Sequence, residues 1–280
     1  MSWILLTLVY GLLKGAREIC KKESLKKSSV IEVLFFYTLF AFLVCIPAST
    51  DFPSVEVRYL PYIFIKSFVI FIAWILSFKA IKHMPISLYG ILDLSRVMFT
   101  TLIGFIVLKE SASVNQIIGL ILVALGLIFL KRRKSDEAED VKPLIVVLAL
   151  ISCLLNSVSA FLDKVLTQYV TSSQLQFYYM LFLVLLYLAY LIIDRSKVDI
   201  KKSVKNYWIW ILAIMFALAD KALFMANENP ASKITIMTLI KQSGCVITIL
   251  AGKFLYKEKN MLHKFVCAAV VIAGIVIAVL

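Results

Sequence analysis

Long apolar runs separated by short polar connections extend from one end of the chain to the other. Each run approaches the roughly 20 residues that an α-helix needs to cross a bilayer. The alternation at period two that marks membrane-spanning strands is absent. The pattern predicts about ten helices: Trp3–Cys20, Ser29–Pro47, Leu60–Lys82, Pro85–Leu108, Val114–Leu130, Pro143–Thr167, Ser173–Ile193, Tyr207–Asn227, Ser232–Tyr256 and Met261–Leu280.

Composition excludes a soluble globular protein. Of the 280 residues, 62% are hydrophobic, and the mean hydropathy is +0.94. Soluble domains have about 45–50% apolar residues. Because lipid offers no hydrogen bonds, each backbone group inside a bilayer must be paired within the protein. We therefore expect an all-α polytopic membrane protein with the lipid bilayer as its surroundings.

The net charge of +13 follows the membrane pattern rather than a nucleic-acid one. Lys and Arg gather in every second connection, roughly twenty of them against four in the others. No nucleic-acid-binding motif accompanies them. Because basic loops stay in the cytoplasm, the bias predicts a protein of the cell membrane with its 131–142 connection inside and both termini extracytoplasmic.

The sequence offers no sign of a cofactor, a metal or a catalytic site. No nucleotide-binding loop of the G-x-x-x-x-G-K-[ST] kind is present, so we expect no ATP hydrolysis by this chain. The first segment, MSWILLTLVYGLL, lacks a signal-peptide cleavage site and is interpreted as a retained helix. The cysteines lack metal-ligand spacing and are expected to be small buried side chains: Cys20, Cys45, Cys153, Cys245 and Cys267.

Short matches in the same order relate the two halves of the chain. They pair FFYTLF at Phe35 with FYYMLF at Phe177, Pro85-Ile86-Ser87 with Pro230-Ala231-Ser232, Lys109-Glu110 with Lys257-Glu258, Gly104 with Gly252, and Gly126 with Gly274. Five helices per half would place the two copies in opposite orientations, with a substrate site between them near the midplane. We therefore predict repeats at 1–130 and 143–280, joined by a linker at 131–142.

Two segments carry a resemblance to a known family. FKAIKHMPISLYGILDLSRVMFTTLIGFIVLKE and LFMANENPASKITIMTLIKQSGCVITILAGKFLYKE each open a helix with Pro and a small residue and close it with Lys-Glu. The chain resembles the EamA-type branch of the drug/metabolite transporter superfamily. The resemblance implies a ten-helix basket whose central cavity is lined by helices one, three, four, six, eight and nine.

Charged residues inside the predicted fourth helix are the first candidates for a binding site. Tyr89, Asp93, Arg96 and Thr100 share one helical face. Ionised side chains at that depth are costly and functional by default. Arg96 suits a carboxylate or phosphate, and Asp93 suits an ammonium group or a proton. The alternative is an internal Asp93–Arg96 ion pair that only fixes the helix.

The ninth helix supplies Lys241, the repeat partner of Asp93 when the two Lys-Glu pairs are aligned. Opposite charges at these positions would pair across the cavity in one state and separate in another. The alternative is a permanent pair that serves as scaffold. Counterparts of this kind are expected where two inverted halves meet.

Other cavity helices add further candidates. The full set of expected substrate-binding residues is Lys14, Trp74, Tyr89, Asp93, Arg96, Asn156, Asp220 and Lys241. Four more charged residues are expected away from the site: Arg17 and Glu18 among the inner headgroups, Lys66 at the outer interface, and Asp163 in solvent.

These observations predict a secondary transporter for a small-molecule substrate. The positive balance of the candidate residues favours an anionic or zwitterionic metabolite, such as an amino acid, an organic acid or a phosphorylated compound. A choline-like cation held by an aromatic box is the alternative. A membrane-embedded enzyme acting on a lipid-linked sugar and a channel are less favoured, since no catalytic set and no filter-like loop is present. A homodimer is left open.

Overall fold

The computed structural model describes residues 3–48, 54–108, 114–132, 141–194, 199–232, 237 and 240–279. These residues form helices joined by short turns. The helices are α1 (Trp3–Ser24), α2 (Val30–Cys45), α3 (Leu60–Lys82), α4 (Ile86–Asp93), α5 (Ser95–Leu108), α6 (Val114–Arg132), α7 (Pro143–Leu166), α8 (Ser172–Asp194), α9 (Ile200–Lys205), α10 (Tyr207–Glu228), α12 (Ser243–Phe254) and α13 (Met261–Val279), with 3-10 turns at Ile46–Ala48 and Val57–Tyr59.

Most predicted helices are found within a few residues of their expected ends, and α3 has the predicted bounds. The short helix α9 was not expected. Asp199 begins it by accepting a hydrogen bond from the backbone N–H of Lys202. The greater part of the predicted 131–142 linker lies outside the described residues, as does the Lys109-Glu110 pair.

Within the described residues, four helical segments are long and apolar enough to span a membrane: Val57–Lys82, Pro143–Leu166, Ser172–Asp194 and Tyr207–Glu228. Shorter apolar helices accompany them. The outward faces are apolar as well; for example, Ile65 on α3 is 52% exposed and Leu185 on α8 is 50% exposed. Exposed apolar surface of this extent is the surface that lipid covers. The chain is a multi-pass membrane protein.

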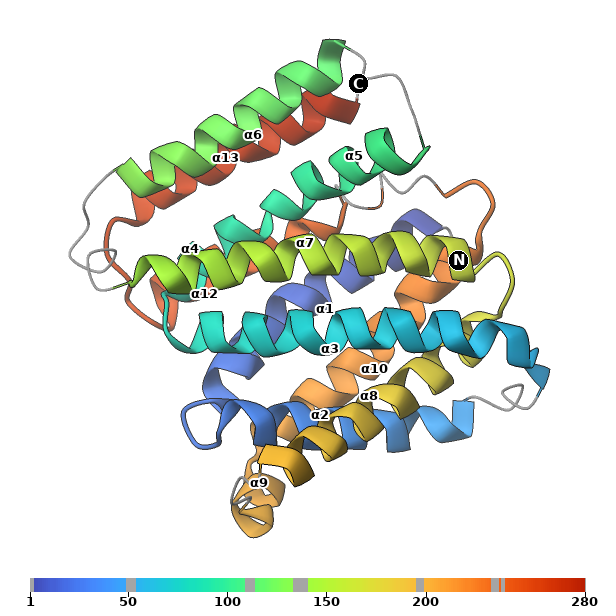
Figure 1. Cartoon of the computed structure of the whole chain (residues 1–280). Coiled ribbons are helices and arrows are strands. Elements are labelled where there is room, and N and C mark those ends of the chain that lie inside the picture. Colours follow the sequence, from blue (N-terminus) through green and yellow to red (C-terminus); the bar gives the residue numbers. More distant parts are fainter. Residues whose placement is uncertain are drawn as a thin grey trace.

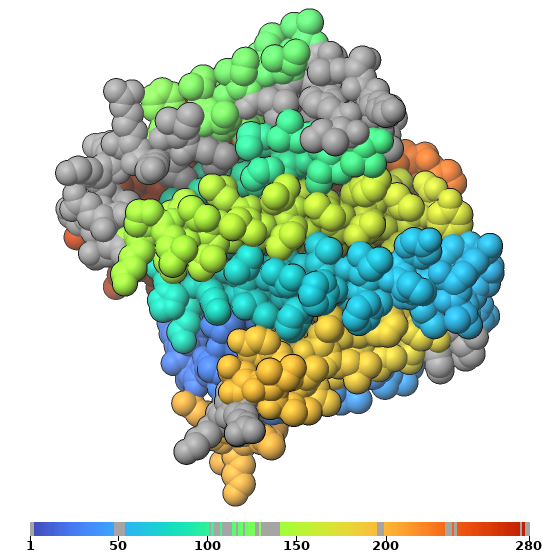
Figure 2. All heavy atoms as spheres, viewed as in Figure 1, coloured from blue at the N-terminus to red at the C-terminus, as the bar shows by residue number. Residues whose placement is uncertain are grey.

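The long helices lie side by side, and both chain termini lie at the same end of the bundle (Figure 1). On one face, α3 and α7 pack along their lengths and form a continuous surface (Figure 2). Helices α6 and α13 pack mainly on each other at the side of the bundle (Figure 1). The main core includes α2, α3, α8 and α10, where aromatic side chains such as Tyr37, Phe78 and Tyr179 are buried.

Glycines bring α1 into close contact with the segment that begins α12. A methyl group on Gly15 would lie 2.6 Å from the carbonyl oxygen of Gly244, and one on Gly11 would lie 2.9 Å from the carbonyl oxygen of Ile240. Small residues of this kind let membrane helices approach at backbone distance. This contact holds the part of α1 that contains its charged residues against the segment that contains Lys241.

The predicted fourth helix is divided into α4 and α5 by one residue, Leu94. The N–H of Leu94 donates to the carbonyl of Ile91 at 3.1 Å, and the N–H of Val97 donates to the carbonyl of Leu94 at 3.1 Å. Each of these hydrogen bonds joins residues three positions apart instead of four, which is the pattern of a 3-10 turn. The turn directly follows Asp93, so it fixes where that carboxylate lies.

Candidate functional site

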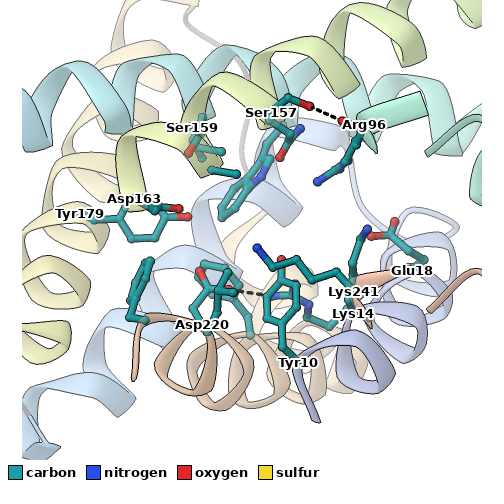
Figure 3. A pocket seen from close by; sticks show the side chains of 18 of the residues that line it. Tyr10, Lys14, Glu18, Arg96, Ser157, Ser159, Asp163, Tyr179, Asp220 and Lys241 are labelled. Carbon is teal, nitrogen blue, oxygen red and sulfur yellow. Dashed lines mark hydrogen bonds and ion pairs between the residues drawn. The ribbon is translucent and has the colours of Figure 1, made fainter. Parts of the chain in front are cut away.

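A polar cavity of about 90 Å³ lies among α1, α3, α5, α7 and α10 (Figure 3). A single buried water needs ~10–15 Å³ in this measure, so the space suits several waters or a small solute. Its lining combines charged groups with aromatic rings. The lining residues are Tyr10, Lys14, Arg17, Glu18, Lys21, Tyr37, Lys66, Ile70, Trp74, Arg96, Thr100, Asn156, Ser157, Ser159, Ala160, Asp163, Tyr179, Leu212, Phe216, Asp220, Leu223, Phe224, Lys241 and Gln242.

One carboxylate, Asp93, serves two cations at the edge of the cavity. The Nζ atom of Lys14 lies 2.5 Å from Asp93 Oδ2. Arg96 Nε lies 2.5 Å from Asp93 Oδ1, within ion-pair distance but without the alignment of a hydrogen bond. Asp93 does not itself line the cavity, whereas both cations do. The group therefore presents one uncompensated positive charge to the cavity.

Two further ion pairs each join α1 or α3 to a carboxylate across the cavity. Arg17 Nη1 lies 3.3 Å from Asp220 Oδ1, and Lys66 Nζ lies 3.2 Å from Asp163 Oδ1. Lys66 also lies 3.0 Å above the centre of the Tyr179 ring. Since buried charges are retained only when paired, these contacts explain how the chain carries them inside an apolar bundle.

Lys241 enters the cavity from the segment before α12 (Figure 3). Its Nζ lies 5.6 Å from the centre of the Tyr10 ring. Among the residues that the structure describes, no carboxylate lies within 4.0 Å of this ammonium group. Asp93, its expected partner, is occupied by Lys14 and Arg96 instead.

Aromatic side chains form the remaining wall. The rings of Tyr37 and Trp74 are 5.6 Å apart, and those of Trp74 and Phe216 are 5.1 Å apart in an edge-on arrangement. The guanidinium carbon of Arg17 lies 5.2 Å from the centre of the Phe216 ring. This wall offers apolar contact beside the charged groups.

Six of the eight expected site residues line the cavity together: Lys14, Trp74, Arg96, Asn156, Asp220 and Lys241. Tyr89 does not: it is 1% exposed, and its hydroxyl lies 2.5 Å from Ser77 Oγ inside the packed bundle. Tyr89 belongs to α4 and Arg96 to α5, and the turn at Leu94 separates these two helices.

Four charged residues lie in the cavity wall against expectation. Arg17 and Glu18 were expected among headgroups, Lys66 at the outer interface and Asp163 in solvent. All four line the cavity, and they are 7%, 5%, 1% and 6% exposed. Each turns inward because an opposite charge lies near it, including Lys21 Nζ at 2.7 Å from Glu18 Oε1.

Their spacing carries a signal that sequence reasoning missed. Lys14, Arg17, Glu18 and Lys21 recur at intervals of three and four, which places them on one helical face. Charged residues on one face of a helix indicate a single polar environment, such as a shared cavity, rather than separate headgroup contacts. The stripe also predicts which face of α1 points toward the interior of the bundle.

The fold is that of a polytopic helical membrane protein, and it encloses a charged cavity. Residues 1–132 match the model of the EamA-like transporter family. That family lies within the drug/metabolite transporter superfamily, and the matched residues make up just under half of the chain. The match indicates a membrane transporter of this superfamily.

Solved structures share the fold. One, described as "Crystal structure of protein", superposes with a TM-score of 0.69 over 99% of this chain and 96% of its own length, at 13% sequence identity. No curated protein matches the sequence.

Proposed function

We propose that the chain is a secondary transporter that moves a small anionic or zwitterionic metabolite by alternating access. It would act in the cell membrane with both termini extracytoplasmic. The observation that carries the proposal is the cavity: charged side chains from both halves of the chain meet in one polar space inside a membrane bundle. Intramembrane charges of this kind mark substrate or ion pathways.

The helix contacts support two inverted repeats, at 1–130 and 143–280. In chain order, α1 corresponds to α7, α2 to α8, α3 to α10 and α5 to α12. Under this correspondence the α1–α10 contact becomes the α7–α3 contact, and both are present. The same correspondence turns α2–α10 into α8–α3, and α1–α12 into α7–α5. A pseudo-two-fold arrangement of this sort places a substrate between the halves.

The register of the repeats agrees with the site. Lys14 and Lys21 on α1 are separated from Asn156 and Asp163 on α7 by the same number of positions that separates FFYTLF from FYYMLF. All four residues line the cavity. The two halves therefore offer equivalent helical faces to the proposed substrate.

Both central helices are also interrupted at equivalent places. A tight turn follows Asp93 at Leu94, and another follows Lys241 at Gln242, where the N–H of Cys245 donates to the Gln242 carbonyl at 2.9 Å. Discontinuous helices near the midplane are a recurring feature of transporter binding sites. This match supports Asp93 and Lys241 as repeat partners.

The charge balance favours an anionic group on the substrate. Six cations and three carboxylates line the cavity, and Asp93 behind the wall supplies a fourth carboxylate. Within the described residues, a net charge of about +2 is thus left for the substrate to compensate, because buried charge without a partner is costly. A choline-like cation is less well served, since Asp163 and Asp220 already hold Lys66 and Arg17.

The proposal is tested by solute exchange in proteoliposomes. Purified protein in vesicles loaded with a defined mixture of amino acids, organic acids and sugar phosphates is expected to move at least one of them, as measured by mass spectrometry of the external medium. Arg96→Gln should abolish transport of an anion, because the substitution removes the guanidinium group that would bind the anion through two parallel hydrogen bonds. Glu56→Gln, an exposed surface change, is the control. Transport of that anion at the unmutated rate by Arg96→Gln would contradict the proposal.

A further inference from the structure

A carboxylate from one half of the chain caps a helix of the other half. Glu258, in the connection between α12 and α13, accepts hydrogen bonds from the backbone N–H groups of Ile86 at 2.7 Å and Ser87 at 3.3 Å. It also accepts from the Ser87 hydroxyl, and Lys264 Nζ lies 3.0 Å away. Pro85, the residue at the helix start, contributes no side-chain cap of its own. Free N–H groups at a helix start attract an anionic side chain.

The chain is shaped to bring Glu258 to this place. Lys257 and Asn260, on either side of it, have φ values of 51° and 55°, in the left-handed region that residues other than glycine seldom adopt. The N–H of Glu258 donates to the carbonyl of Gly252 at 2.9 Å. A methyl group at Gly252 would lie 2.9 Å from Glu258 Oε2 and 3.0 Å from Ser87 Cβ. The contact therefore requires both a special turn and a glycine.

The end of α1 joins the same cluster. Lys22 Nζ donates to the carbonyl of Met84 at 2.6 Å, and the Tyr256 hydroxyl donates to Glu23 Oε1 at 2.7 Å. Three elements from separate parts of the chain are thus tied at the end of the bundle where α4 begins.

This end of the cavity is closed by packing. No residue of α4 or α12 is among those that line the cavity. Ile86, Ser87 and Ile91 are fully buried, and Gly90 lies close against the side chain of Thr248. Here α4 packs against α12 and α1, so a solute could pass between these helices only if they separated.

We propose that Glu258 is a gate latch: its bonds to the start of α4 hold this end of the cavity shut, and they break when the transporter opens there. The inference rests on the proposed alternating-access function. The latch joins the second half of the chain to the helix that carries Asp93. Its release would therefore free the segment next to the charged site to move.

Hydrogen–deuterium exchange of the full-length protein in lipid nanodiscs tests the latch without any solute. Glu258→Ala should speed amide exchange about tenfold or more at Ile86 and Ser87. If the latch holds the gate, faster exchange should spread through α4 and into α12, Ser243–Phe254. Ser87→Ala removes one bond and should give a smaller response over the same segments. Glu56→Ala, an exposed carboxylate, is the control.

A response confined to the first turn of α4 would show a simple helix cap and overturn the proposal, as would no response. If Glu258→Ala loosens every helix alike, Ser87→Ala decides: acceleration across α4 and α12 supports the latch, and anything less overturns it. Because no transported solute is involved, failure here is distinct from failure of the transport assay.

Discussion

Neutralising Asp93 is the change with the sharpest expected effect on stability. Asp93→Asn removes the one carboxylate shared by Lys14 and Arg96 and leaves two adjacent cations. The Lys14 and Asp93 side chains are only 8% and 9% exposed, so water screens them poorly. Breaking a buried ion pair by removing one partner costs about 3–5 kcal/mol.

The comparison is with a surface pair of the same chemistry. Glu56 and Arg58 are 61% and 68% exposed, and exposed pairs contribute about 0–1 kcal/mol. Glu56→Gln should therefore leave the protein almost as stable as before. A second comparison is Lys14→Met combined with Asp93→Asn, which removes opposite charges together. It should recover part of the loss, because replacing a whole buried pair is far cheaper than breaking it.

Thermal unfolding in detergent micelles, followed by intrinsic fluorescence, measures all of these proteins under one condition. The expected order of midpoints is wild type and Glu56→Gln highest, the double variant intermediate, and Asp93→Asn lowest. The reasoning is refuted if Asp93→Asn has the same unfolding midpoint as Glu56→Gln, or if the double variant has a lower midpoint than Asp93→Asn.

Three other outcomes follow from the same contacts. Lys241→Met should leave the unfolding midpoint within a degree or two of wild type, since no described carboxylate pairs with Lys241. The same change should reduce anion transport in vesicles severalfold or more. Unchanged transport would show that Lys241 is not part of the site. Asp163→Asn should destabilise by roughly 3–5 kcal/mol, because it leaves Lys66 buried alone, and a melt at the wild-type temperature would contradict the pairing. Gly15→Val should separate α1 from Gly244 at a cost of about 1–3 kcal/mol or more, which thermal unfolding measures directly; a neutral effect would argue against the close helix contact.

Hydropathy alone located most of the helices, because spanning length leaves little freedom in where an apolar segment begins and ends. It could not locate the turn at Leu94. That turn depends on hydrogen bonds local to Ile91 and Val97 and on the ion pairs that hold Asp93. Nor could it predict α9, since a six-residue helix has no apolar periodicity to detect.

The cavity lining was predictable where a charge had no plausible place except an interior, as for Arg96 and Asp220. It was not predictable where a residue near a helix end had two acceptable positions. Lys66 can extend toward a headgroup or turn inward, and only the position of Asp163 on a distant helix decides between them. Asp93 has two partners. The Asp93–Arg96 ion pair was among the expected alternatives and is confirmed, whereas Lys14 was missed because it comes from another helix.

Access to the cavity from both sides of the membrane is the most direct test of the account. Ala160 lines the cavity, and the native cysteines Cys20, Cys45, Cys153, Cys245 and Cys267 are buried, so Ala160→Cys in a cysteine-free background gives a single reporter. The measurement is its labelling by a membrane-impermeant thiol reagent applied to either side of sealed vesicles. Alternating access predicts labelling from each side in turn. A reporter that reacts from one side alone, or from neither, would contradict it.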